Sequence, residues 1–432
     1  MKTNPKKYFF LLLPVFIFLS GCAPDYIYRS DYSQCITTSD RACENHSIQL
    51  HNQDTNAEYQ LGFVEIDDQG QIRDRQQMDA LLDDIYKTAA FDNVLLNVFV
   101  HGWHHNAAPG DSNIEGFKDN LKKLSQIEHQ YSQTEGYRPR KVIGIYLGWR
   151  GESIDFPGLK YTTFWDRKST AEDVGYLGVT ELLLKLEEIT NVKNTQPPKF
   201  RSRLVVIGHS FGGAAVYNAI SQIMASRFIN SKPDKNFTGS VLGFGDLVVL
   251  LNPAFEAMQF APLHDLAQSR CSYFASGHPR LAILTSETDY ATKYAFWMGR
   301  VFTTFLETHN TIVREHCQGK YKLILDEGKA DRNAVGHFKP FLTHTLTLAK
   351  NQKTNVKQTA DSYYPTINWE QIRQKNSQQY GDTILTHLQK TALLNPYLNI
   401  QVSQEIMDGH NDIFGDELMR FIRMLIISST ND

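Results

Sequence analysis

Short apolar runs alternate with longer amphipathic stretches along most of this 432-residue chain. Runs rich in Val, Ile and Leu are typical of strands buried on both faces, as in a parallel sheet. The apolar runs are Asn93 to Val100, Lys141 to Leu147, Arg203 to Ile207, Leu247 to Leu251 and Arg280 to Leu284. The amphipathic stretches between them include Ile114 to Glu128, Ser169 to Glu188 and Gly212 to Ser226. This alternation predicts an α/β domain whose mainly parallel sheet is flanked by helices.

Two segments depart from this rhythm. Residues 22 to 55 are polar, and we expect a tether and an irregular N-terminal segment there, which leaves residues 56 to 432 for the α/β domain. Residues 297 to 395 are rich in Lys, Gln, Asn, Thr and His, and we expect a partly helical insertion on one edge of the sheet. Beyond it, Leu398 to Val402 is predicted to be the last strand and Ile413 to Ile427 the closing helix.

The first 21 residues have the pattern of a secretory signal. Three lysines lie within Met1 to Lys7, and the apolar run Tyr8 to Leu19 follows them. About a dozen apolar residues are too few for a helix that crosses a bilayer, which needs roughly 20. The segment is therefore predicted to direct export and to be removed.

The signal ends in Leu19-Ser20-Gly21-Cys22, which resembles the lipobox of bacterial lipoproteins. The resemblance implies that Cys22 is acylated and becomes the new N-terminus. Its acyl chains would hold the protein on a membrane of the bacterial cell envelope, because each methylene buried in the bilayer adds about 0.8 kcal/mol of binding free energy. Ala23 and Pro24 follow in place of the aspartate that retains many such proteins in the inner membrane, which points, more weakly, to the outer membrane. The alternative is a plain secretory peptide with a chance cysteine.

Four cysteines remain besides Cys22, namely Cys35, Cys43, Cys271 and Cys317. An even number in an oxidising compartment predicts disulfides, and four cysteines allow three connectivities. Proximity in sequence favours Cys35 with Cys43 and Cys271 with Cys317, and free buried thiols are the alternative.

The charge of the chain excludes one class of partner. A formal net charge of -3 creates no strong field of one sign, so nucleic acid is not indicated as a partner. The sequence is silent on the oligomeric state.

The strongest local motif is Gly208-His209-Ser210-Phe211-Gly212-Gly213, which lies between a predicted strand and a predicted helix. This is G-x-S-x-G in the setting that the motif requires, a strand, a tight turn and a helix. Small neighbours let the backbone segments pass closely, and the start of the helix presents N–H groups to developing negative charge. We expect Ser210 to be a nucleophile; the alternative is a glycine-rich turn with an idle serine.

In these residues the chain resembles the α/β-hydrolase family of esterases and lipases. A second matching segment, Phe99-Val100-His101-Gly102-Trp103, ends another predicted strand, where many members carry a His-Gly step. The resemblance implies that the backbone N–H groups of Trp103 and Phe211 bind the oxyanion, and that His101 is structural. His101, His104 and His105 also permit a metal hypothesis, but without a carboxylate or cysteine cluster we expect no metal and no other cofactor.

The family's chain order is serine, then acid, then histidine. Asp289 is the expected acid because it follows the strand that ends at Leu284, with Glu287 as runner-up and helix capping as the alternative role. His410 is the expected base because it lies between the last predicted strand and the closing helix. The competing histidines are His337 and His344. The nearby carboxylates Asp408 and Asp412 could tune His410, although we expect them to be solvated loop residues.

These residues predict a serine hydrolase that cleaves carboxylic esters, of a small molecule or a lipid, through an acyl-enzyme. Hydrolysis of amides, or acyl transfer to an acceptor other than water, would use the same residues. The alternative from another class is a catalytically inactive hydrolase fold that acts as a membrane-attached binding module. Trp103, Trp149, Phe211 and Phe255 are expected either to line an acyl pocket or to belong to the core.

Overall fold

The computed structural model describes residues 26–37, 42–136, 138–151, 164–195, 201–231, 241–273, 277–349 and 376–430. The predicted signal segment and Cys22 lie outside the described residues.

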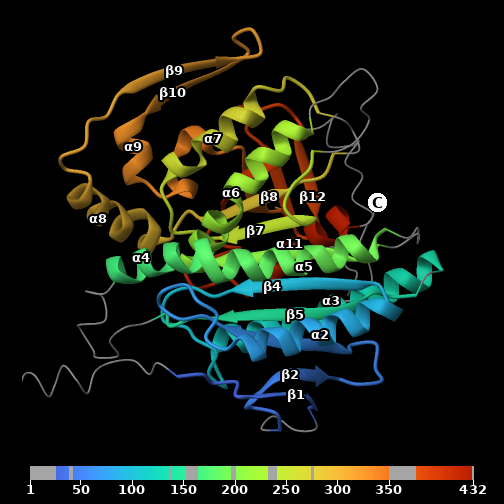
Figure 1. Cartoon of the computed structure of the whole chain (residues 1–432). Helices are drawn as coiled ribbons and strands as arrows, with labels where there is room; N and C mark the ends of the chain where they lie inside the picture. The colour runs from blue at the N-terminus through green and yellow to red at the C-terminus, as the bar shows by residue number, and fades with distance from the viewer. Residues whose placement is uncertain are drawn as a thin grey trace, which may run out of the picture.

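A 12-stranded sheet runs through the molecule in the order β1-β2-β3-β5-β4-β6-β7-β8-β14-β11-β13-β12 (Figure 1). Its strands are β1 (Asp31–Ile36), β2 (His46–His51), β3 (Tyr59–Glu65), β4 (Val94–Val100), β5 (Lys141–Gly148), β6 (Arg203–His209), β7 (Leu247–Leu251), β8 (Leu281–Ser286), β11 (His344–Leu348), β12 (Ser377–Tyr380), β13 (Thr383–His387) and β14 (Tyr397–Val402). From β3 to β11 each neighbouring pair is parallel, whereas β2 with β3, β11 with β13 and β13 with β12 are antiparallel.

Helices cover both faces of this sheet. They are α2 (Arg75–Phe91), α3 (Ser112–Glu135), α4 (Phe164–Val174), α5 (Thr180–Lys193), α6 (Phe211–Asn230), α7 (Ala257–Gln268), α8 (Phe296–Thr303), α9 (Glu327–Arg332) and α11 (Asp416–Thr430), with π-helical turns η2 (Gly175–Val179) and η3 (Ala291–Ala295) and short 3-10 turns η4 (Val335–His337) and η5 (Lys339–Phe341). No described helix is both long enough and apolar enough to span a bilayer.

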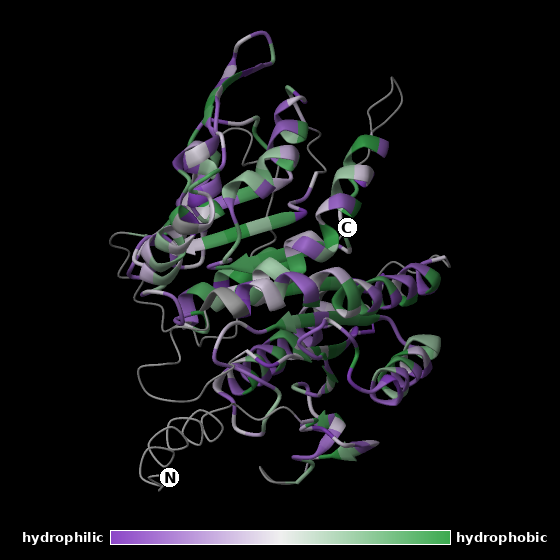
Figure 2. Ribbon diagram, turned by 60° about the vertical axis from the view of Figure 1, so that its left-hand side comes forward, coloured by the Kyte–Doolittle hydropathy of each residue, from purple (hydrophilic) through white to green (hydrophobic). Residues whose placement is uncertain are grey.

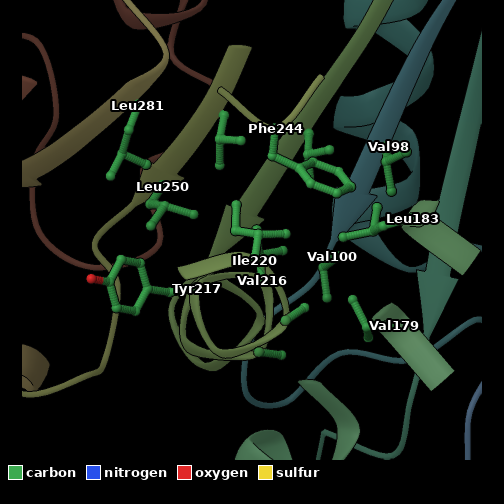
Figure 3. Close-up of a cluster of buried hydrophobic side chains, with 14 of the residues drawn as sticks. Val98, Val100, Val179, Leu183, Val216, Tyr217, Ile220, Phe244, Leu250 and Leu281 are labelled. Carbon is green, nitrogen blue, oxygen red and sulfur yellow. The ribbon is translucent and has the colours of Figure 1, made fainter. Parts of the chain in front are cut away.

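The core is divided by the sheet because successive side chains of a strand point to opposite faces. In β4, Leu96 and Val98 pack with α2, α5, α6 and α7, while Leu95 and Phe99 pack with α3 and α11. Part of the first cluster is drawn in Figure 3, and Figure 2 shows apolar strands beneath helices with hydrophilic outer faces. The predicted α/β class with a mainly parallel sheet and flanking helices is confirmed.

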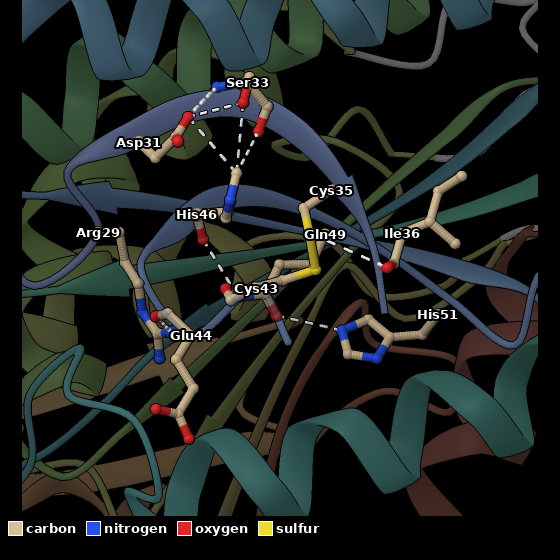
Figure 4. Close-up of a disulfide and its surroundings, with 10 residues drawn as sticks. All are labelled: Arg29, Asp31, Ser33, Cys35, Ile36, Cys43, Glu44, His46, Gln49 and His51. Atoms are coloured by element: carbon tan, nitrogen blue, oxygen red, sulfur yellow. Dashed lines mark hydrogen bonds and ion pairs between the residues drawn. A yellow bond between two sulfur atoms is a disulfide. The ribbon is translucent and has the colours of Figure 1, made fainter. Parts of the chain in front are cut away.

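The prediction of an irregular segment over residues 22 to 55 is wrong for two stretches, because β1 and β2 form one edge of the sheet. The polar side chains that suggested a tether are partly buried there. Gln49 donates to the carbonyl of Cys43, and His51 lies 3.2 Å from Gln49 Oε1 (Figure 4). Hydrogen bonds within the protein thus replace hydrogen bonds to water for Gln49 and His51, so these polar side chains can be buried in a strand.

In the described part of residues 297 to 395, α8 and α9 are helical and three strands lie at the other edge of the sheet. These strands are β11, β12 and β13, so β14 is an internal strand rather than the edge. A separate hairpin, β9 (Thr311–His316) with β10 (Tyr321–Asp326), projects from the insertion.

The strand order places two loops of the sequence side by side. β4 is flanked by β5 and β6, and the helices that follow β4 and β6, α3 and α6, cover opposite faces of the sheet. A crevice forms at such a switch point outside the carboxyl ends of the strands, where ligands bind in open α/β sheets. The loop after β4 and the turn after β6 meet there.

Both favoured disulfides are present, Cys35–Cys43 and Cys271–Cys317. They close loops with sequence separations of 8 and 46 residues. On the chain-entropy account, removing Cys271–Cys317 by paired Cys→Ser changes should lower the free energy of unfolding by about 4 kcal/mol, and removing Cys35–Cys43 by about 2.5 kcal/mol. Urea unfolding of the two double variants under non-reducing conditions measures this ranking; the reverse order would contradict it.

Candidate active site

Ser210 stands at the sharp turn between β6 and α6, with φ of 55° and ψ of -119°. Such a backbone conformation is strained for a residue that has a Cβ. A Cβ at Gly212 would lie 2.2 Å from the carbonyl oxygen of Val100, and one at Gly208 would lie 2.8 Å from the carbonyl oxygen of Gly212. Glycine at position 212 therefore lets the turn approach the end of β4, and glycine at position 208 lets the strand pass close to the start of α6.

Three side chains from distant parts of the chain meet at this turn. Ser210 Oγ lies 2.7 Å from His410 Nε2, and His410 Nδ1 lies 2.9 Å from Asp289 Oδ2. The carboxylate is fully buried and the serine is 2% exposed, whereas 17% of the imidazole remains accessible. The expected nucleophile, base and acid are therefore within hydrogen-bonding distance of one another, in the arrangement of a Ser-His-Asp triad.

Two buried side chains hold the loop that carries His410. Asn252, which follows β7, donates to the carbonyl oxygens of Gly409 and His410 at 3.1 and 2.9 Å and accepts from the N–H of Ser286. His209 Nε2 lies 3.0 Å from the same His410 carbonyl. Burial, with the neighbouring His410, lowers the pKa of His209 well below its ordinary value, so the neutral ring donates through Nε2. The ends of β6, β7 and β8 thereby fix the loop after β14.

Asp289 also begins a helical segment. Its Oδ1 accepts from the N–H groups of Ala291 and Thr292, and its Oδ2 accepts from the Thr292 hydroxyl at 2.5 Å. Burial acts to raise the pKa of Asp289, but the imidazole of His410 and the Thr292 donors outweigh it and hold that pKa below its ordinary value. The capping role and the orienting role weighed for Asp289 are thus filled by different oxygens of one carboxylate.

His337, one of the competing histidines, lies behind the acid. Its Nε2 is 2.9 Å from Thr292 Oγ1, and its ring also bonds to the backbone of Asp289. Because the Thr292 hydroxyl donates to Asp289, the His337 ring donates to Thr292. The other competitor, His344, lies on β11 with its ring 4.9 Å from that of His387.

The histidines after β4 do not converge on a metal. His101 is buried, with Nδ1 donating to the carbonyl of Gly102 and Nε2 accepting from the N–H of Trp149, so both ring nitrogens are used within the fold. His105 donates to Asp111, the N-cap of α3. Among the described residues, one group could offer three ligand atoms to a metal ion, Glu307, His309 and Asp331, and Arg300 already pairs with Asp331.

Both residues expected to donate to the oxyanion lie next to Ser210 or its neighbours in the fold. Phe211 is the first residue of α6, at the positive end of the helix dipole. Trp103 follows Gly102, where an added Cβ would lie 2.7 Å from the Cβ of Ser210. The rings of Trp103 and Phe211 are 6.4 Å apart, centroid to centroid.

Other residues considered from the sequence do not join the triad. Trp149 stacks on His101 and Phe255 stacks on Tyr217, both buried, so these two aromatic rings belong to the core. The carboxylates of Glu287, Asp408 and Asp412 instead bond to loop groups: Glu287 to the N–H of Gln404, Asp408 to Gln404 Nε2, and Asp412 to the N–H of Asp408.

Sequence reasoning missed Asn252, Thr292 and the role of His209. His209 occupies the variable position of G-x-S-x-G and Thr292 lies three residues after the acid, so both had a positional signal. Asn252 had the weaker signal of a polar residue directly after a buried strand.

Comparison with known proteins gives no relative: no family model matches the chain, and no curated protein and no solved structure matches it.

Acid is expected to destabilise the fold through two buried histidines near the site. Burial lowers the pKa of His101 to about 4 and that of His337 to about 4. An unfolded histidine binds its proton near pH 6.5, so between these values the unfolded chain holds more protons than the folded chain. The free energy of unfolding should fall as pH drops from about 6.5 to about 4, by up to about 1.4 kcal/mol per pH unit for each histidine.

Urea unfolding at several pH values tests this expectation. His101→Gln and His337→Gln should each show a shallower dependence on pH than the unaltered protein, and His129→Gln on α3 is the control. Equal slopes for all four proteins would refute the assignment.

Proposed function

We propose that this protein is a serine hydrolase that cleaves carboxylic esters or related acyl bonds. The observation that carries the proposal is the continuous series of short contacts from Ser210 Oγ through the His410 ring to Asp289. A serine hydroxyl is a weak nucleophile unless an oriented base removes its proton, and this arrangement supplies that base. The expected assignment to the α/β-hydrolase family is part of the proposal.

The reaction follows from the geometry. His410 Nε2 takes the proton of Ser210 as Oγ attacks the substrate carbonyl, and ionised Asp289 stabilises the resulting imidazolium. The N–H groups of Trp103 and Phe211 receive the negative charge on the carbonyl oxygen. When the tetrahedral intermediate collapses, His410 gives its proton to the leaving alkoxide and an alcohol departs.

Water completes the cycle on the acyl-enzyme. His410 removes a proton from water, the hydroxide attacks the acyl carbon, and the second intermediate releases the carboxylic acid as His410 returns the proton to Ser210 Oγ. No metal and no organic cofactor takes part in these steps.

Three features support the proposal. Serine, acid and histidine occur in the order of the α/β-hydrolase family. Each follows a strand of the parallel series, β6, β8 and β14, so all three lie at the carboxyl edge of the sheet. Ser210 has a strained positive φ, and residues with such backbone strain cluster at active sites.

The cellular setting is proposed from the N-terminal sequence. We propose that Cys22 is acylated and anchors the protein to a membrane of the bacterial envelope, with the outer membrane favoured. The disulfides Cys35–Cys43 and Cys271–Cys317 support an oxidising compartment of this kind.

Labelling with a fluorophosphonate tests the nucleophile. The unaltered protein should be labelled, and Ser210→Ala should lose the label and about 10³-fold or more of the rate on p-nitrophenyl esters. Ser226→Ala, an exposed serine on the same α6 helix, is the matched control and should retain both. A protein that is correctly folded but unlabelled would instead favour the inactive binding module.

Thr292 should act through Asp289. Thr292→Val removes the hydroxyl that donates to the carboxylate and accepts from His337, so we expect kcat/KM on p-nitrophenyl esters to fall about tenfold, chiefly through kcat. Thr292→Ser keeps the hydroxyl and should recover most of the rate. A Thr292→Val variant with unchanged kcat, or a Thr292→Ser variant as slow as Thr292→Val, would exclude this role.

A further inference from the structure

A single short segment, residues 290 to 306, carries an unusual share of exposed apolar surface. It follows the acid Asp289 and includes η3, α8 and the turn after α8. Six large apolar side chains there are between 43% and 89% exposed, out of eighteen such side chains in all the described residues. The six are Tyr290, Tyr294, Trp297, Met298, Phe305 and Leu306. We call this set the aromatic ridge.

The ridge belongs to an amphipathic helical segment whose apolar exposed side is not needed by the core. Tyr290, Tyr294, Trp297 and Met298 follow the spacing i, i+4, i+7 and i+8, which places them on one side of a helix. The opposite side carries the residues that pack inward: Thr292, Phe296 and Gly299, all buried. The core therefore accounts for the buried side alone, and the six side chains of the ridge remain exposed, with Tyr290 and Tyr294 stacked on each other.

The ridge is joined directly to the proposed catalytic centre. The carboxylate of Asp289 accepts from the N–H groups of Ala291 and Thr292, so the triad acid also caps the start of this segment. Figure 1 shows α8 on the side toward which the β4 and β5 arrows point, the carboxyl edge of the sheet. Whatever covers the ridge lies beside that edge.

The charge of the segment favours a lipid surface. No Asp or Glu occurs from Tyr290 to Leu306, although the whole chain carries 47 acidic residues. Lys293 is exposed, with its ammonium 5.5 Å from the Tyr294 ring centroid. The first carboxylate after the segment is the exposed Glu307, next to Leu306. Trp and Tyr beside a cation are typical of side chains at the interface of an anionic bilayer.

The start of the described chain lies at the same edge. The N–H groups of Tyr28 and Arg29 donate to Glu65, the last residue of β3, which pairs with Gly148 at the end of β5. Cys22 is four residues before Tyr26, and four residues span at most about 14 Å. A membrane that holds an acylated Cys22 would thus lie close to this edge of the sheet.

We propose that the aromatic ridge docks on a phospholipid bilayer and turns the carboxyl edge of the sheet, with Ser210, toward esters in that bilayer. The docking is independent of catalysis; the choice of bilayer esters as substrates rests on the proposed function. A second copy of the chain would also cover apolar surface, but it would not explain the lack of carboxylates or the position of the chain start.

Quenching of Trp297 measures docking at the ridge itself. The full chain with Cys22→Ser, which removes the proposed acylation site, is mixed with vesicles of phosphatidylcholine and phosphatidylglycerol that contain brominated acyl chains. Tryptophan fluorescence should be quenched, and Trp297→Phe in the same background should abolish most of that quenching. Quenching that is absent, or that persists fully in Trp297→Phe, overturns the proposal.

Paired surface variants distinguish vesicle binding through the aromatic ridge from nonspecific binding through any exposed apolar side chain. Phe305→Ser with Leu306→Ser should weaken vesicle binding at least tenfold. The matched control is Phe91→Ser with Val192→Ser, two residues that are 83% and 57% exposed and lie near the amino ends of β4 and β6, at the opposite edge of the sheet. Equal losses in both pairs, or a ridge that mediates a dimer in sedimentation without binding vesicles, would refute docking on lipid.

Activity distinguishes failure of docking from failure of the proposed chemistry. The ratio of hydrolysis of a vesicle-embedded ester to that of a dissolved p-nitrophenyl ester should fall at least tenfold in the Phe305/Leu306 pair and stay constant in the control pair. An unchanged ratio overturns the orientation of the site toward the bilayer. If the protein hydrolyses neither ester, the proposed function fails, while the quenching result still decides whether the ridge docks.

Discussion

The close approach of the backbone around Ser210 is the constraint on which the candidate site depends. The turn after β6 approaches the end of β4 closely because Gly212 has no side chain, and Gly208 leaves room for the start of α6 within the turn itself. Gly102 leaves room for the side chain of Ser210. The same contacts force Ser210 into a positive φ and bring the Trp103 loop beside the start of α6. The packing of the parallel sheet thus keeps the backbone of Ser210 in its strained conformation.

Around that turn, polar groups that are far apart in sequence complete one another's hydrogen bonds. Asn252 and His209 bind the carbonyl of His410, and Thr292 and the His410 ring bind the carboxylate of Asp289. A buried polar group without a partner is costly, so each of these contacts both stabilises the fold and limits how the imidazole can move. The orientation of the His410 ring therefore depends on residues at the ends of β6, β7 and β8 as well as on the loop after β14.

The carboxyl edge of the sheet also gathers the features on which the proposed docking to a bilayer rests. The capping of η3 by Asp289 connects the aromatic ridge to the triad, and the described chain starts beside the ends of β3 and β5. An enzyme that meets its substrate at a surface needs its reactive groups on the side that faces that surface. In this protein the carboxyl edge of the sheet, the apolar segment with α8 and the first described residues lie on one side.

The alternation of strands and helices could be predicted from the chain alone, because apolar periodicity depends on local burial. Ser210, Asp289 and His410 could be predicted as a candidate triad because each follows a recognisable strand, and the structure brings them within hydrogen-bonding distance of one another. Both disulfide pairings also followed from proximity along the chain. Long-range packing brings the polar residues of β1 and β2 into the sheet, extends the sheet beyond β14 with strands of the insertion, and buries Trp149 and Phe255 in the core. No local pattern predicted these outcomes. The contacts that Asn252 and His337 make could not be derived from the sequence, because they join residues that are 158 and 45 positions apart. Such contacts depend on strand order, and strand order is set by packing across the whole sheet rather than by any local pattern.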